Sequence, residues 1–163
     1  MVIKDPQELF MRLLSEANNA EKQMTRALPK MARAAHNEKL VEAFQHHLEE
    51  TQGQLERIEQ AADSIPEIRI KRLKSHAMES LIQEGEELID STEKGPLRDA
   101  GLIAAAQKVE HFEIAAYGTL CELAGQLGHT KAKEILAETL KEEKSTDDKL
   151  NKLAKQDVNK RAG

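Results

Sequence analysis

The sequence of 163 residues has no tryptophan, one tyrosine and three phenylalanines, and it contains only eight glycines and four prolines. Proteins built from many short strands use more aromatic and more turn-forming residues than this. The scarcity of both disfavours a β-sandwich or barrel and indicates an all-α protein. The length suits one domain with a complete core, so we expect a single helical domain over residues 1–163.

The sequence also lacks cysteine pairs, long apolar runs and an excess of positive charge. Its single cysteine, Cys121, excludes an internal disulfide and is typical of the reducing cytoplasm. No apolar run approaches the ~20 residues of a membrane span, and the N-terminus has no signal-peptide pattern. A net charge of −5 argues against general affinity for nucleic acid or acidic membranes. We therefore expect a cytoplasmic protein that binds neither, and we read the basic run 69–74 as a solvated helix face.

Capping signals predict a helical hairpin in the first third of the chain. The run Asp5-Pro6-Gln7-Glu8 combines an N-cap, a proline at the first helical position and a reciprocal capping glutamate. It begins a helix that we expect to reach about Ala35, with a bend at Pro29. Asn37 then caps a second helix, which continues to about Asp63.

Three further helices are predicted in the rest of the chain. Ser64-Ile65-Pro66-Glu67 repeats the capping signal and opens a third helix from about Ile65 to Thr92, long enough to cross between two hairpins. Its expected apolar face is Leu73, Ala77, Leu81, Gly85 and Leu88. Gly95-Pro96 starts a fourth helix that ends near Gly125, and Thr130 caps a fifth that ends at about Ala154. We expect the polar tail from about residue 157 to fray.

The fourth helix carries two carboxylates on a stripe that is otherwise apolar. Residues three and four apart share one face of a helix. That rule places Glu110 and Glu113 in the middle of the row Ala106, Glu110, Glu113, Tyr117, Leu120 and Ala124. Two ionised carboxylates facing a core would each cost several kcal/mol without a partner. The pattern therefore indicates a cation between the helices.

The first, second and fifth helices repeat this anomaly. Glu21 interrupts an apolar row of the first helix, His47 and Glu50 lie midway along the second, and Glu143 with Asp147 lies midway along the fifth. No Lys or Arg falls on the same central stripes. If these four helices pack as a bundle, the acids meet at one level.

Two hairpins joined by a crossover, with acids projecting inward, is the layout of ferritin-like di-metal carboxylate proteins. Their usual Glu-x-x-His motif is absent here, although His47 and Glu50 have the reversed spacing. We assign as metal ligands Glu21, Glu50, Glu110, Glu113 and Glu143. His47 and Asp147 are ligands or hydrogen-bond partners of ligands. Carboxylates with an occasional imidazole suit two iron ions, or manganese.

Other residues in these rows have two readings. Tyr117 lies one turn beyond Glu113, so its hydroxyl could reach a carboxylate or a bound oxygen species, or the residue could be a core ring with a satisfied hydroxyl. His111 is one position away from the Glu110 stripe and flanks it.

The sequence leaves two functions open for the chain as a whole. One is a non-haem di-iron oxidase or peroxidase acting on dioxygen or peroxide, and the other is a non-enzymatic dimeric helical module whose polar layer specifies register.

Four short strings resemble the bacterial YciF/YciE stress-protein family of the ferritin-like superfamily. They are AEKQ at 20–23, HLEET at 47–51, KVEHFEIA at 108–115 and EEK at 142–144. The resemblance extends from about Lys4 to Asn159. It implies a four-helix bundle with a di-iron-type site, relatedness to rubrerythrin-like proteins, a homodimer and expression under stress. The matched positions include the glutamates chosen above from periodicity.

Overall fold

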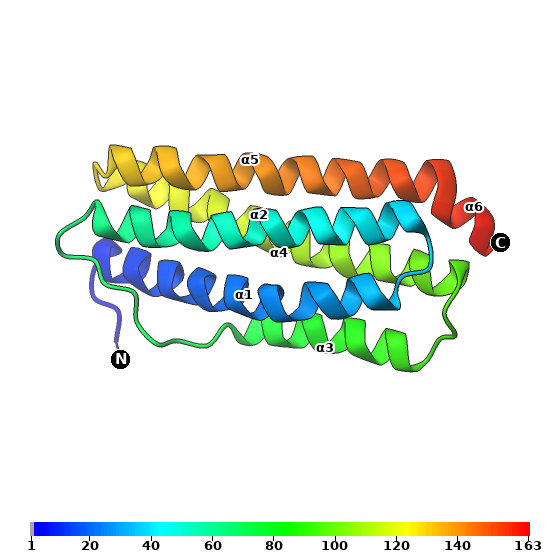
Figure 1. Cartoon of the computed structure of the whole chain (residues 1–163). Coiled ribbons are helices and arrows are strands. Elements are labelled where there is room, and N and C mark those ends of the chain that lie inside the picture. The colour runs from blue at the N-terminus through cyan, green and yellow to red at the C-terminus, as the bar shows by residue number, and fades with distance from the viewer. Residues whose placement is uncertain (1) are drawn as a thin grey trace.

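The computed structural model describes residues 2–163, and over this range the chain is helical apart from its connections, of which the longest covers residues 64–75 (Figure 1). The elements are α1 (Pro6–Ala34), α2 (Glu38–Asp63), α3 (His76–Asp90), α4 (Pro96–Gln126), α5 (Thr130–Leu153), a π-helical turn η1 (Ala154–Val158) and α6 (Asn159–Ala162). The predicted all-α class is confirmed. The first two caps form as expected, since the side chains of Asp5 and Asn37 accept hydrogen bonds from the backbone of their own helices.

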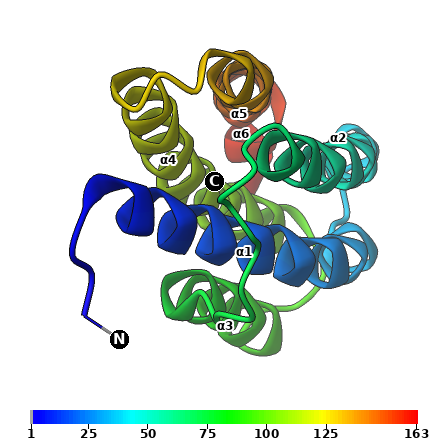
Figure 2. The same ribbon diagram turned by 90° about the vertical axis from the view of Figure 1, so that its left-hand side faces the viewer.

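Helices α1, α2, α4 and α5 form a four-helix bundle, and α3 lies outside it (Figure 2). The hairpin α1–α2 packs against the hairpin α4–α5, so that α1 contacts α4 and α2 contacts α5. Helix α3 runs back along the bundle against α1 and α4, which returns the chain to the end where α4 begins (Figure 1). Every neighbouring pair in the bundle is antiparallel. This arrangement confirms the ferritin-like order predicted from the sequence.

The bundle has two apolar clusters, one toward each end. Phe10, Leu14, Ile58, Leu120 and Leu136 represent the first cluster, near the α2–α3 connection. The second, toward the α1–α2 turn, includes Met24, Leu28, Phe44, Leu102 and Leu150. Burial of each large side chain contributes about 1.5–3 kcal/mol. Along each helix the two clusters are separated by the polar residues discussed below.

The third helix begins later than predicted. The chain makes a turn at residues 64–67 and then runs extended to Ser75, which is the true N-cap of α3. In this segment Ile68 is buried and Arg69 exposed, then Ile70 is half-buried, an alternation typical of extended chain. The prediction of a helix from Ile65 was wrong because the capping pattern at 64–67 forms only an isolated turn.

Side chains of α1 hold this extended segment in place. The Ser15 hydroxyl accepts a hydrogen bond from the Lys71 amide at 2.9 Å, and Asn19 Oδ1 accepts one from the Ser75 amide at 2.8 Å. Gln23 Nε2 donates to the Ser75 carbonyl at 3.0 Å. These partners satisfy backbone groups that a helix would have satisfied internally. The basic run 69–74 is therefore not a helix face.

The apolar face of α3 agrees with the expected one at Leu81, Gly85 and Leu88 and differs at Ala77, which is exposed. Met78, Ile82 and Ile89 complete this face. Opposite α3, a Cβ on Gly101 would lie 2.6 Å from Leu88 Cδ2, so glycine permits the close approach of α4.

Within residues 2–163, no helix combines the length and apolarity needed to cross a membrane.

The C-terminal tail is held in place and does not fray after residue 156. The backbone continues through η1 into α6, and Val158 is buried in the second cluster. Asp157 accepts a hydrogen bond from Asn37 Nδ2 at 3.1 Å and pairs with Arg161 at 2.8 Å. The sequence-based expectation missed Val158 as an anchor because it is a single apolar residue among polar ones.

Asp99 ties the start of α4 to the turn between α1 and α2. Its buried carboxylate accepts hydrogen bonds from the backbone amides of His36 at 2.7 Å and Asn37 at 2.8 Å. Replacing Asp99 with Ala should lower the free energy of unfolding by about 2–3 kcal/mol, because two charge-assisted hydrogen bonds are lost. Urea unfolding measures this loss. The exposed Asp148→Ala is the control, and equal stability of the two variants would contradict the prediction.

Candidate metal centre

Five side chains from the four bundle helices form a buried polar layer between the two apolar clusters. Helix α1 contributes Glu21, α2 contributes His47, α4 contributes Glu110 and Glu113, and α5 contributes Glu143. The four glutamates are at most 2% exposed and His47 is 4% exposed. Each lies on the buried face of its helix because apolar residues one and two turns away define that face.

Glu143 lies at the centre of this layer. One oxygen or nitrogen atom from each of His47, Glu110 and Glu143 can be chosen so that all lie within 4.8 Å of one another. The same holds for Glu21, Glu113 and Glu143. The two groups share Glu143, so its carboxylate stands between two sets of potential ligands. Carboxylates can bridge two metal ions in this way.

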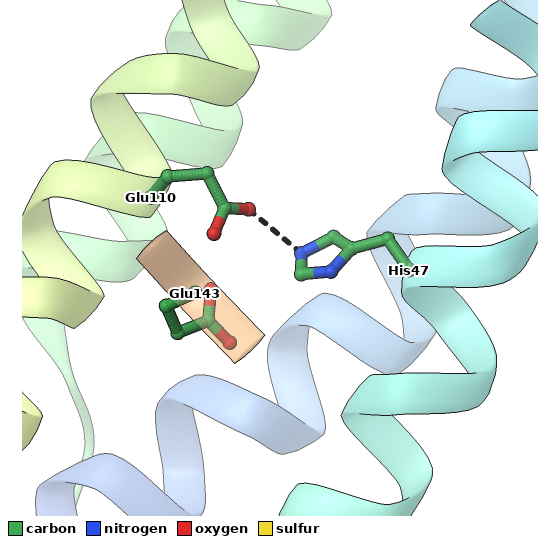
Figure 3. Close-up of side chains that lie close together, drawn as sticks. All are labelled: His47, Glu110 and Glu143. Carbon is green, nitrogen blue, oxygen red and sulfur yellow. Dashed lines mark ion pairs between the residues drawn. The ribbon is translucent and has the colours of Figure 1, made fainter. Parts of the chain in front are cut away.

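His47 and Glu110 form an ion pair inside the bundle. The His47 Nε2 atom lies 2.8 Å from Glu110 Oε1, and Figure 3 shows the two side chains reaching toward each other with the Glu143 carboxylate beside them. Burial by itself lowers the pKa of His47, but the charge and hydrogen-bonding capacity of Glu110 outweigh it and hold this pKa well above its usual range. The imidazole is therefore the cation of the layer when the protein is metal-free.

Tyr117 contacts the opposite end of the layer. Its hydroxyl donates a hydrogen bond to Glu21 Oε1 at 2.7 Å, so it reaches a carboxylate, and its ring is also a buried member of the first apolar cluster. Burial raises the pKa of Glu21 to about 7, against the lowering effect of the Tyr117 hydrogen bond and of His47. The pKa of Tyr117 is itself well above its usual range because the ring is buried beside carboxylates.

Glu113 and Glu143 have no hydrogen-bond partner at either oxygen among the described residues. Burial and the neighbouring carboxylates raise the pKa of both well above the usual range. Most of the other unpartnered buried polar atoms of residues 2–163 also belong to this layer, and no Lys or Arg in this range pairs with its four glutamates. Unpartnered carboxylate oxygens and an imidazole are the donor set that iron or manganese prefers. The residues therefore fit a pair of such ions.

The structure places Glu50 at the edge of the layer and outside both groups. Its side chain is 14% exposed and contacts His46 Nε2 at 3.0 Å, while the Thr146 hydroxyl donates to it at 3.1 Å. Burial acts to raise the pKa of Glu50, but hydrogen bonds from His47 and Thr146 outweigh it and lower this pKa. The sequence ranked Glu50 with the central acids because its helical position is nearly equivalent to that of His47.

Asp147 lies at the same outer edge, one turn beyond Glu143. Its Oδ1 atom accepts a hydrogen bond from Gln107 Nε2 at 3.4 Å and lies 3.4 Å from Nε2 of the exposed His111. Sequence reasoning named neither Gln107 nor His46 as a partner of these acids. Both could have been found by extending the acidic stripes one turn, since Gln107 precedes Glu110 by three residues and His46 precedes Glu50 by four.

The comparison with known proteins agrees with the fold. Residues 5–163 match the family described as Domain of unknown function (DUF892). The chain is 59% identical over 162 residues to Protein YciF of Escherichia coli K12, covering 99% of this chain and 98% of that protein.

Solved structures give the same result. The crystal structure of the E. coli stress protein YciF superposes with a TM-score of 0.94, covering 97% of this chain and 99% of that one, at 59% identity. YcfI of Rhodopseudomonas palustris, described as a candidate structural protein, has 38% identity and a TM-score of 0.88, over 91% and 94% of the two chains. A Xanthomonas campestris protein with 22% identity shares the fold, with a TM-score of 0.74 over 93% and 92% of the chains. The chain therefore belongs to the DUF892 family and is a homologue of the stress protein YciF, as its sequence motifs indicated.

Proposed function

We propose that this protein binds two metal ions, iron or manganese, in the polar layer and uses them for redox handling of dioxygen or peroxide, or of iron itself, under stress. His47, Glu110 and Glu143 hold one ion, and Glu21, Glu113 and Glu143 hold the other. The observation that carries this proposal is the shared position of Glu143 between two buried groups with unpartnered oxygens. A pair of dications would compensate this concentration of negative charge.

The residues of the chain have separate roles in such a centre. The bound ions supply electron transfer to an oxidant. Tyr117 orients Glu21 through its hydrogen bond. The ion pair with His47 orients Glu110 in the metal-free protein, and a neutral His47 imidazole would bind the metal in place of this pairing. The two apolar clusters exclude water from both ends of the layer. Glu50 and Asp147 belong to the edge of the centre, where Thr146 and Gln107 hold their carboxylates.

The relationship to YciF supports the stress context, because the E. coli protein is described as a stress protein. We extend the proposal to a cytoplasmic homodimer, in line with the resemblance noted from the sequence. Light scattering on the purified protein tests the assembly. A monomer at all concentrations would remove this part of the proposal and leave the metal site unaffected.

Metal uptake tests the central claim. The purified chain, stripped with chelator and mixed with ferrous iron without oxygen, should retain about two ions after desalting. Addition of dioxygen or peroxide should then produce the ultraviolet absorption of ferric carboxylate centres. Retention of fewer than about 0.2 ions per chain for both iron and manganese would contradict the proposal.

A metal-free polar layer is the second candidate. It is favoured by the internal ion pair of His47 with Glu110 and by the raised pKa of Glu21, because both reduce the net charge that must be buried. The description of the R. palustris relative as a structural protein agrees with it. In this case neither metal would raise the melting temperature, whereas a specific centre should raise it by several degrees.

Removing the Tyr117 hydroxyl tests its role in the proposed metal centre. In Tyr117→Phe the Glu21 carboxylate loses its 2.7 Å hydrogen bond, so its pKa should rise above about 7 and protons should compete more strongly with metal. We expect a 3- to 10-fold lower metal affinity near pH 6.5 and a smaller loss at pH 8. Competition with a coloured chelator measures both. An unchanged affinity at both pH values would show that Tyr117 does not act on the centre.

A further inference from the structure

An apolar pocket of about 270 Å³ opens between α1 and α4, directly beside the polar layer. Leu13, Ala17 and Ala20 line its α1 side together with Glu16, and Phe112 and Ala116 are among the residues of its α4 side. The alanines leave space here because a longer side chain at these positions would fill the gap between the helices. The pocket is therefore built from small residues on two neighbouring helices.

The inner end of this pocket is polar. Glu21, Glu113 and Tyr117 are the three buried polar side chains in its lining. Glu21 Oε2 and both Glu113 oxygens have no hydrogen-bond partner among residues 2–163. A ligand in the pocket would thus meet an apolar wall along its length and hydrogen-bonding groups at one end.

The two edges of the polar layer differ in chemistry. Glu50 and Asp147 lie with His46 and His111 at the α2, α4 and α5 side, where charged and polar side chains surround them. The α1 and α4 side is covered mainly by Ala, Leu and Phe. At the α1 and α4 side, a charged ligand would lose its hydration without gaining a partner of opposite charge. An uncharged ligand does not carry this cost.

We propose that the pocket between α1 and α4 binds a small uncharged organic molecule, with an alkyl or ring body along the alanine-lined wall and a single hydroxyl group that donates toward the unpartnered oxygens of Glu21 and Glu113. Binding depends only on the pocket. A role for this ligand as the substrate of a neighbouring metal centre rests on the function proposed above.

The pocket volume sets the size of the ligand. A cavity of about 150 Å³ lined by apolar side chains is enough to hold benzene. A pocket of about 270 Å³ therefore accepts a substituted ring or a chain of several carbons. The compound 1-pentanol meets these requirements and has no absorption that would interfere with tyrosine fluorescence.

The chain contains its own reporter for this test. Tyr117 is the only tyrosine, there is no tryptophan, and the Tyr117 ring lies in the pocket lining. Titration of the metal-free full-length protein with 1-pentanol should change tyrosine fluorescence saturably. We expect a Kd on the order of 1 mM, which is the affinity that burial of five carbon groups supports.

Variants of α4 locate the binding. Ala116→Phe places a ring in the pocket and should weaken binding at least ~10-fold, whereas the exposed Ala104→Phe on the same helix should leave it unchanged. Ala116→Leu provides a smaller obstruction if the Phe variant folds poorly. The absence of saturation at about ten times the expected Kd, or full binding by both Ala116 variants, would overturn the proposal.

Metal content separates this proposal from the proposed function. If the wild type binds 1-pentanol and takes up no metal, the pocket stands and the metal centre fails. If it takes up two ions and no alcohol, the metal centre stands and the pocket fails. If both are found, loading with redox-silent zinc should change the Kd for 1-pentanol in wild type, because Glu21 and Glu113 belong to both sites.

Discussion

Replacing Glu143 with Gln should reduce metal content from about two ions per chain to fewer than ~0.5. The effect is large because Glu143 contributes to both groups of buried ligands, so one substitution removes a charged oxygen ligand from each. Glutamine has the same size as glutamate, so packing around the position changes little. Elemental analysis after equal exposure to ferrous iron gives the result directly.

The neighbouring residue provides a matched control for this experiment. Glu142 lies one position earlier on α5 but turns outward and pairs with Arg57. The variant Glu142→Gln should therefore retain about two ions, apart from a small loss of stability. If Glu143→Gln and Glu142→Gln bind equal amounts of metal, Glu143 is not the shared ligand.

Without metal, Glu143→Gln should have the opposite effect on stability. The wild-type carboxyl has a raised pKa because it is buried beside other carboxylates, so its ionisation opposes folding at pH 8. The variant should therefore melt several degrees higher than wild type at pH 8 in chelator and about equally at pH 5. If the variant melted at a lower temperature than wild type at pH 8, the ionised Glu143 carboxylate would already have stabilising partners in the metal-free layer.

The metal-free wild type should lose stability as the pH rises from about 5 to 8. Glu21 has a folded-state pKa of about 7 against an ordinary value of 4.5, so the folded protein holds a proton in this interval that the unfolded chain releases. Stability must fall across it, by roughly 3 kcal/mol for Glu21 alone. Glu113 and Glu143 add to this loss because burial and the neighbouring carboxylates raise their pKa values as well.

His47 also makes the folded protein less stable as the pH rises, whereas Glu50 makes it more stable. The pKa of His47 is raised, so the stability from its charged form is complete below about pH 6.5 and is lost as the pH passes its folded value. The pKa of Glu50 is lowered, so its contribution is present above about 4.5 and is lost in acid. The sum predicts a stability maximum on the acid side of neutrality.

Urea unfolding at several pH values in chelator measures this profile, and repetition with bound manganese provides the comparison. Metal binding needs ionised carboxylates, so the loaded protein should gain stability over the same interval. The difference between the two curves should widen with pH. A metal-free curve that rises from pH 5 to 8 would contradict burial of these carboxyls.

Much of this centre could be predicted from single-helix periodicity. Glu110 and Glu113 interrupt an apolar stripe, and the structure finds both buried. The same pattern identified Glu21 and Glu143. Their status as metal ligands remains a prediction. The relative ranking of the residues was less accurate, because a stripe records which face a residue occupies and not how far it lies from the bundle axis. His47 is therefore more central, and Glu50 more peripheral, than the sequence indicated.

The segment from 64 to 75 shows a limit of a different kind. Its capping pattern and apolar residues favoured a helix, yet Ser15 and Asn19 of α1 provide hydrogen bonds to its backbone from more than fifty positions away. Local propensity is weak enough for such contacts to override it. Val158 likewise became an anchor only because the second cluster offered a place for it.

The sequence by itself determined the helical class, the ends of α1, α2 and α4, and the presence of acids on core-facing stripes, because these depend on residues within a few positions of one another. Only the tertiary structure decided which acids meet, that Glu143 is shared, and that Tyr117 donates to Glu21. It also decided the pKa directions and the pocket beside the layer. These properties arise between helices, where distance, burial and neighbouring charge are set by packing and leave no periodic signal along the chain.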